Sequence, residues 1–260
     1  MYIITGYNSF LAKNFLKKTS IKKNEIFKIK RNIKKLKKIK NKKVKIINFA
    51  AFYQKETYAK DILKVLDANL IYPARIVQIL IEQNNKITFF NIASYFQLKE
   101  NFKRKSNFYS NVKNAFIEIL EYFEKKKYLN YYNIYLYDIF GDGDKRDKIF
   151  NHIIKKYKKN EVLNIQNPEN LIAPISIIDT CKVINNYLLD NNRPNEIHIN
   201  SGKIITLRQL CLIASSVLKK LRVNHSRNCS KDFLKIFKTK KYNINRNLSE
   251  SLRNFFKKYV

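Results

Sequence analysis

The chain has 260 residues, 45% of them hydrophobic, so it can bury a substantial core, and its composition excludes a disordered protein. No apolar run approaches the roughly 20 residues that span a bilayer, and the first six residues predict a buried strand and a turn where a secretory leader would begin. We therefore expect a cytoplasmic protein without a membrane span. The net charge of +33 suggests a nucleic-acid ligand, but lysines are spread along the whole chain and the composition follows A/T-rich codons, so we expect no specific nucleic-acid partner.

Strands and helices are expected to alternate in the first half of the chain. Apolar runs predict strands at residues 3–5, 25–29, 44–49, 87–93 and 133–137. Helical spacing of apolar residues predicts helices at 10–18, 59–83 and 109–126. The lysine-rich stretch 34–45 predicts a solvated helix face and loop, with a polyanion site as the alternative. This alternation is typical of an α/β fold with a doubly wound parallel sheet, the Rossmann type, whose ligands bind beyond the carboxyl ends of the strands.

The second half of the chain is less regular. We expect a turn at 141–144, helices at 147–157, 207–221 and 248–259, a short strand and a helix within 175–189, and a strand at 197–200. No long linker separates the halves. We therefore expect residues 1–138 to form a dinucleotide-binding domain, completed by about 174–190, and residues 139–260 to form mainly a smaller C-terminal substrate-binding lobe.

The turn after the first strand is a candidate phosphate site. A pyrophosphate needs close approach to backbone N–H groups at a helix start, which favours small residues at three-residue spacing. Here these positions hold Gly6, Ser9 and Ala12, so a single glycine remains. An ordinary strand-to-helix turn would have a similar sequence, and the segment alone leaves both interpretations open.

Basic residues follow the second strand at Lys28, Lys30 and Arg31. An NAD-specific fold places an acidic residue there to bind the ribose hydroxyls, whereas basic side chains favour the additional 2'-phosphate of NADP. We expect NADP as the cofactor, with NAD possible. The alternative is that these residues belong to a generally lysine-rich surface.

Tyr109 and Lys113 are one helical turn apart and therefore share a helix face. A nearby ammonium stabilises a phenolate, which makes a tyrosine usable as a general acid or base. Such a pair is expected by chance in a chain rich in both residues, but this pair opens the helix that follows Ser94. Ser94 ends a predicted strand at the ligand edge and can bind the same reacting oxygen.

No metal site is expected. The cysteines and histidines are scattered and lack ligand spacing, so neither a disulfide framework nor a metal cluster is predicted from Cys181, Cys211, Cys229, His152, His198 and His225.

An ordered set of short segments carries a resemblance that covers nearly the whole chain. The segments are 5–11, 48–51, 69, 92–94, 109–113, 139–141, 178–179, 200–202, 207–210 and 248–259. With them the chain resembles the NAD-dependent epimerase/dehydratase family of extended short-chain dehydrogenases. The resemblance implies an enzyme in which Tyr109 exchanges a proton with the C4 oxygen of a nucleotide-linked sugar while hydride moves between C4 and the nicotinamide. It implies that Ser94 holds this oxygen and that Lys113 also binds the nicotinamide ribose.

The resemblance implies further binding residues. Those expected at the cofactor are Gly6, Ser9, Phe10, Leu11, Lys30, Arg31, Ala50, Ala51 and Asn69. Those expected at the substrate are Tyr95, Asp138, Phe140, Gly141 and Lys148, most of them in the segment 137–148 that would lean over the sugar nucleotide. The sequence of residues 136–144 is most similar to that of reductases that make dideoxyhexoses such as abequose from CDP-linked 4-keto sugars.

The chain also departs from the family's pattern. Two motif glycines are replaced, and the stretch between the second strand and Val44 is too short for the usual strand and helix, so we expect the sheet to lack one strand. Tyr95 and Phe96 stand where the 4,6-dehydratases of the family carry an acid pair, which disfavours dehydration. We expect NADPH-dependent reduction of a nucleotide-linked 4-keto-6-deoxy sugar for a surface polysaccharide. The alternatives are a 4-epimerase that retains NAD and a non-catalytic relative, and a homodimer is possible through the helices that carry Asn69 and Tyr109.

Overall fold

The computed structural model describes residues 1–53, 58–98, 107–226, 234–237, 242, 244 and 247–260. The chain divides into two compact units. The first unit comprises Met1–Leu136 and Ile184–Ile197, and the second comprises Tyr137–Val183 and His198–Val260. Among the described residues, no helix has the length and apolar character needed to cross a membrane.

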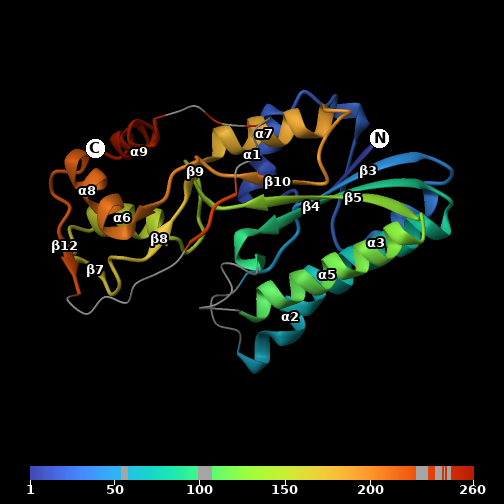
Figure 1. Cartoon of the computed structure of the whole chain (residues 1–260), viewed down its shortest axis with the longest axis horizontal. Coiled ribbons are helices and arrows are strands. Elements are labelled where there is room, and N and C mark those ends of the chain that lie inside the picture. Colours follow the sequence, from blue (N-terminus) through green and yellow to red (C-terminus); the bar gives the residue numbers. More distant parts are fainter. Residues whose placement is uncertain (54–57, 99–106, 227–233, 238–241, 243, 245–246) are drawn as a thin grey trace. The chain divides into compact units, whose positions relative to one another are not determined.

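A six-stranded sheet with the strand order β10-β5-β4-β3-β1-β2 forms the centre of the first unit (Figure 1). Its strands are β1 (Tyr2–Thr5), β2 (Ile26–Ile29), β3 (Lys43–Asn48), β4 (Lys86–Ser94), β5 (Leu129–Leu136) and β10 (Glu196–Ile199). The pairs between β2 and β5 are all parallel. The predicted α/β fold with a Rossmann-type sheet is therefore confirmed.

The strand order places a topological switch point between β1 and β3. The chain leaves β1 toward β2 on one side and then returns to build β3, β4 and β5 on the other. In open α/β sheets, ligands bind at such a switch point, beyond the carboxyl ends of the strands, here β1 and β3. The end of β1 and the loop after β3 are thus the first place to look for a ligand.

Helices cover both faces of the sheet (Figure 1). On one face, α3 (Tyr72–Glu82) and α5 (Phe108–Lys125) bury aliphatic and aromatic side chains against alternate residues of β1, β3, β4 and β5. On the other face, Phe15 of α1 (Phe10–Lys18) packs against Phe49. Tyr187 of α7 (Ile177–Leu189) packs on the same face against Phe90.

Arg193 supports this second face. Its guanidinium carbon lies 5.3 Å from the ring centroid of Phe90 and 5.2 Å from that of Tyr132. Its side chain also donates hydrogen bonds to the backbone oxygens of Tyr187 and Leu188 near the end of α7. These contacts satisfy terminal helix carbonyls and make Arg193 a structural residue.

The connection from β2 to β3 is as short as the sequence predicts. It contains a 3-10 helix, Ile33–Lys38, in place of a strand and an α-helix. Leu36 of this helix is fully buried in the core, whereas the lysines around it are exposed. The lysine-rich stretch is therefore a solvated surface anchored by the buried side chains of Leu36 and Ile39.

The predicted long helix before β4 consists of several shorter turns. It runs through η3 (Ala59–Asp61), α2 (Ile62–Leu66), the π-helix η4 (Asp67–Ile71) and α3. The strand β5 begins four residues earlier than predicted, because residues 129–132 also pair with β4 and Leu129 is buried in the core.

The second unit contains α6 (Ile149–Lys158), α8 (Leu207–Val217) and α9 (Leu248–Lys257) packed around one apolar core. The described residues of this unit also form three two-stranded sheets. Their strands are β6 (Asp138–Phe140) with β9 (Pro174–Ser176), β7 (Leu163–Ile165) with β12 (Val223–His225), and β8 (Leu171–Ile172) with β11 (Ile205–Thr206).

Candidate functional site

Gly6 is the residue that the switch point requires. Its φ is 58°, in the left-handed region that favours glycine. A Cβ built on it would lie 2.4 Å from the backbone nitrogen of Ala50 and 2.5 Å from the carbonyl carbon of Phe49. No side chain fits there. The end of β1 and the loop after β3 therefore meet backbone to backbone, as in a turn that lets a phosphate approach closely.

A buried polar pair fixes this contact. The hydroxyl of Thr5 donates to Oδ1 of Asn48 over 2.6 Å and accepts the N–H of Ala50 over 3.3 Å. Both side chains are buried. Sequence reasoning missed this role for Thr5 and Asn48, although polar residues that end two adjacent apolar strands were a usable signal.

The helix α1 begins directly after the Gly6 turn. Ser9 is its N-cap, and its hydroxyl accepts the N–H of Ala12 over 3.2 Å. Its own N–H donates to the carbonyl of Gly6 over 2.9 Å. Phe10 and Leu11 open the helix at its positive end, where an anion is stabilised. Ser9 therefore serves as a cap at a position where the glycine motif has a glycine.

Basic residues at the end of β2 and just after it approach the same turn. The ammonium groups of Lys28 and Lys30 lie 5.9 Å and 5.6 Å from the ring centroid of Tyr7. The hydroxyl of Tyr72 donates to the carbonyl of Lys30 over 2.9 Å, and burial raises the pKa of this tyrosine to about 12. Arg31 is exposed. Two of the three predicted basic residues thus flank the aromatic side chain of Tyr7 in the Gly6 turn.

Asn69 acts on the loop that contains Ala50 and Ala51. Its Oδ1 accepts the N–H of Phe52 over 3.3 Å, and its Nδ2 donates to the carbonyls of Phe52 and Val65. The side chain is buried inside the π-helix η4, a rare geometry that often occurs at functional sites. Its amide is committed to backbone groups, so Asn69 fixes the path of the loop after β3.

Tyr109 and Lys113 lie on the first turns of α5, as predicted. The helix is capped by Asn107, whose side chain accepts the N–H of Ser110 over 2.8 Å. The ammonium of Lys113 lies 5.9 Å from the ring centroid of Tyr109 and donates to the carbonyl of Ile92 over 2.7 Å. Lys113 is 3% exposed, and burial lowers its pKa to about 8. This is an unusually poised lysine next to a phenol.

Ser94 ends β4 two residues after Ile92, so Lys113 and Ser94 meet the same strand end. The hydroxyl of Ser94 caps the short 3-10 helix η5 (Tyr95–Gln97). Tyr109 is 7% exposed and lies edge-on to Tyr53, with ring centroids 5.2 Å apart. Tyr53 in turn stacks on Phe96, so aromatic rings from the loops after β3 and β4 cover the candidate tyrosine.

Tyr95 is also part of this aromatic layer. Its ring stacks on Phe96 with centroids 4.2 Å apart, and it is 8% exposed.

The predicted substrate residues of the second unit have different surroundings. A side-chain oxygen of Asp138 accepts the N–H of Ala173 over 2.9 Å. Burial lowers the pKa of Lys148, and the nearby carboxylate of Asp138 partly offsets this shift. Gly141 is half-buried after β6. The ring of Phe140 lies in the core of this unit, 5.2 Å from Phe150. Its side chain is therefore a packing element.

Within the described part of the chain, no group of three metal-ligating side chains comes together. Cys181 and Cys211 are buried, and burial raises the pKa of Cys211 to about 11. Cys229 lies outside the described residues.

Known proteins resemble this chain in both sequence and fold. A CDP-abequose synthase from Yersinia pseudotuberculosis is 32% identical over 141 residues, which are 54% of this chain and 49% of that protein. The match thus covers about half the length of this curated relative.

Two solved structures cover nearly all of the chain. One is a UDP-glucuronic acid 4-epimerase from Bacillus cereus in complex with UDP-glucuronic acid and NAD (14% identity, TM-score 0.78, 99% of this chain and 98% of that one). The other is RMD from Pseudomonas aeruginosa complexed with NADPH (12% identity, TM-score 0.75, 100% of this chain and 99% of that one). At these identities the likeness establishes the fold. Residues 3–184 match the family described as NAD dependent epimerase/dehydratase, and the chain belongs to that family.

Proposed function

We propose that the protein is an NADPH-dependent reductase of a nucleotide-linked 4-keto-6-deoxy sugar and that it serves the synthesis of a surface polysaccharide. The observation that carries this proposal is the buried Lys113, which lies beside Tyr109 and binds the end of β4. The family membership and the CDP-abequose synthase relative support the reaction class.

The residues at the switch point fit a dinucleotide. A Cβ at Gly6 would clash with the backbone of Phe49 and Ala50, so this close approach requires glycine. The turn leads into the N-terminus of α1, where a pyrophosphate would be stabilised. Gly6, Ser9, Phe10 and Leu11 would hold the pyrophosphate, and the loop fixed by Asn69 would pass beside it. A bound nicotinamide cofactor would supply the hydride.

Side chains of this protein carry out the proton transfer. Tyr109 donates its phenolic proton to the sugar C4 oxygen as the carbonyl carbon is reduced, and the resulting phenolate is stabilised by the ammonium of Lys113. Ser94 donates a hydrogen bond to the same oxygen. Because its folded pKa is about 8, Lys113 remains mainly protonated at neutral pH and can restore the proton of Tyr109.

NADP is the cofactor that the positive charge favours. Lys28, Lys30 and Arg31 lie at the end of β2, where the ribose of the adenosine would bind, and no acidic side chain stands among them. A charge reversal at Arg31 tests this choice. Arg31→Asp should raise the KM for NADPH at least about tenfold and leave that for NADH nearly unchanged, because a phosphate contact is charge-assisted.

An assay of NADPH oxidation also distinguishes reduction from two alternative functions. A 4-epimerase would co-purify with NAD and interconvert sugars without net oxidation, as the cofactors named in the epimerase structures suggest for those proteins. A non-catalytic relative would bind a dinucleotide without turnover. The test is NADPH oxidation with a panel of CDP-, dTDP-, UDP- and GDP-linked 4-keto-6-deoxy sugars. Oxidation with one of them is expected; bound NAD with epimerisation would contradict the proposal.

We also propose that the second unit holds the sugar nucleotide. Asp138 and Lys148 lie close enough to influence each other's charge, and Lys148 is the N-cap of α6. A cation at this position suits the diphosphate of a sugar nucleotide. Lys148→Met should raise the KM for the sugar nucleotide without changing that for NADPH.

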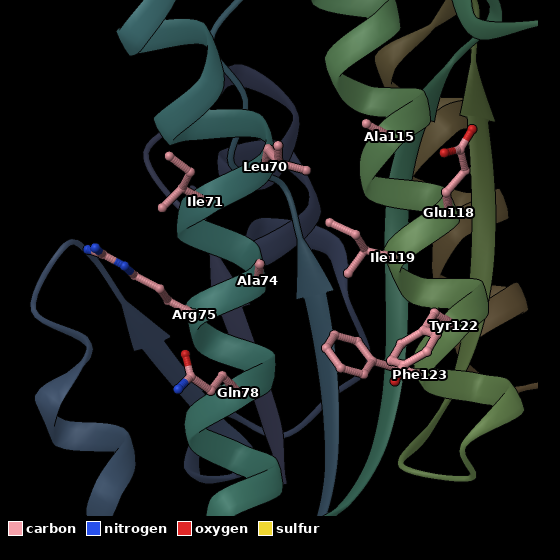
Figure 2. Close-up of a pocket in the computed structure, with 10 residues that line it drawn as sticks. All are labelled: Leu70, Ile71, Ala74, Arg75, Gln78, Ala115, Glu118, Ile119, Tyr122 and Phe123. Atoms are coloured by element: carbon pink, nitrogen blue, oxygen red, sulfur yellow. The ribbon is translucent and has the colours of Figure 1, made fainter.

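An apolar groove supports a homodimer. It has a volume of about 820 Å³ and lies between α3 and α5 (Figure 2). Its walls are mainly aliphatic and aromatic, while Arg75 stands on the α3 side and Glu118 on the α5 side. Opposite charges on the two rims suit a two-fold pair, in which each copy offers the same patch. We propose a second copy of the chain as the occupant.

A further inference from the structure

The end of β4 and the start of α5 carry the candidate catalytic groups, and residues 99–106 between them lie outside the described part of the chain. The described contacts that join these two elements are made by side chains. Lys113 binds the carbonyl of Ile92 on one side of Ser94. A second link is present on the other side, at Gln97.

Gln97 makes hydrogen bonds in two directions. Its Oε1 accepts the N–H of Ser94 over 2.8 Å, and its Nε2 donates to Oδ1 of Asn114 over 3.1 Å. Asn114 returns a bond from its Nδ2 to the carbonyl of Gln97 over 3.3 Å. Gln97 is 4% exposed. A buried amide with its donor and acceptor both used holds its neighbours more firmly than the same bonds in water.

These contacts form a continuous path. Asn114 directly follows Lys113 on α5, and Gln97 closes the turn that begins at Ser94. The position of the Ser94 hydroxyl relative to Tyr109 and Lys113 therefore depends on the amide pair as well as on the lysine.

We propose that Gln97, acting through Asn114, is a positioning residue that holds Ser94 against the helix of Tyr109 and Lys113. This inference rests on the proposed reduction, in which Ser94 and Tyr109 bind one carbonyl oxygen. Two donors that converge on one oxygen must keep their separation, because a displacement of about 1 Å can cost about a hundredfold in rate.

The chain contains a matched control for this role. Thr206 and Gln209 make the same reciprocal capping arrangement at the start of α8, with bonds of 2.9 Å and 3.1 Å. Gln209 is exposed and belongs to the second unit. Gln209→Met removes the same kind of cap as Gln97→Met without touching β4 or α5.

The test compares Gln97→Met, Asn114→Leu, the double variant and Gln209→Met in the full chain. Gln97→Met and Asn114→Leu should each lower kcat at least about tenfold, with the KM for NADPH within about twofold of wild type. The double variant should be no worse than the poorer single variant, because both changes break one path. Gln209→Met should keep the wild-type kcat.

A measurement without substrate separates this inference from the proposed reaction. Exchange of the Ser94 amide hydrogen should be at least about tenfold faster in Gln97→Met than in wild type, because the acceptor of that N–H is lost. Unchanged exchange would overturn the inference even if no sugar is reduced. With an active wild type, a kcat of Gln97→Met within twofold of wild type, additive losses, or an equal loss in Gln209→Met would overturn it too.

Discussion

The buried ammonium of Lys113 should give the protein's stability a characteristic pH dependence, which Lys113→Met should remove. In the unfolded chain this lysine keeps its proton up to about pH 10.5, whereas in the folded chain burial lowers its pKa to about 8. Between these values the unfolded state binds the extra proton. The free energy of unfolding therefore rises with pH in this window, and the penalty for burying the charge is fully present below pH 8.

The size of the effect follows from the separation of the two pKa values. At 1.36 kcal/mol per pKa unit, burial of this ammonium lowers the free energy of unfolding by about 3 kcal/mol at pH 7. About 2 kcal/mol of this should return between pH 7 and pH 9.5, because the folded lysine is then neutral while the unfolded one still holds most of its proton.

Urea unfolding at a series of pH values measures this difference. The free energy of unfolding of wild type minus that of Lys113→Met should rise by about 2 kcal/mol from pH 7 to pH 9.5. Lys18→Met, at an exposed position of α1, controls for the loss of one positive charge. Parallel curves for wild type and Lys113→Met would refute the placement of a buried, partnered ammonium beside Tyr109.

Three further changes test other parts of the structure. Gly6→Ala should lower the free energy of unfolding in urea by at least about 3 kcal/mol and abolish NADPH binding, because it combines a left-handed φ with a backbone clash. Gly143 also has a positive φ but has open space around it, so Gly143→Ala should lower the free energy of unfolding by about 1 kcal/mol. Arg193→Met should lower the free energy of unfolding by about 2 kcal/mol and leave KM values unchanged, because it loses two bonds to α7. Ile119→Glu, in the groove of Figure 2, should shift the protein from dimer to monomer in sedimentation experiments; a dimer that persists would contradict the proposed interface.

The sequence predicted the sheet well because its signals are local. Short apolar runs such as residues 44–49 have few other stable conformations, and helical spacing marked the bounds of α1 at Phe10 and Lys18. The missing strand after β2 was also predictable, because chain length alone excludes a strand and a helix there. The short strands of the second unit, such as β8 and β11, were not predicted, since two-residue pairings depend on distant partners.

The sequence indicated the residues of the candidate site but not the contacts that hold them in place. Spacing located Tyr109, Lys113 and Ser94, but it could not show that Lys113 is buried or that Gln97 and Asn114 join their elements. Those contacts link residues whose sequence separation is 17, and no periodicity reports them. The capping pattern from Ser94 to Gln97 was a readable signal, although it indicated a helix start and not a link to α5. The side chain of Phe140, expected at the substrate, packs in a core that only tertiary structure defines.

In the proposed reaction, the phenol of Tyr109 moves the proton at a sugar carbonyl. The most direct test is NADPH oxidation by Tyr109→Phe with the 4-keto sugar that wild type reduces, alongside Tyr128→Phe at an exposed position just after the same helix. Tyr109→Phe should lower kcat by about 10²-fold to 10⁴-fold while NADPH still binds, and Tyr128→Phe should match wild type. Turnover by Tyr109→Phe at the wild-type rate would contradict the account.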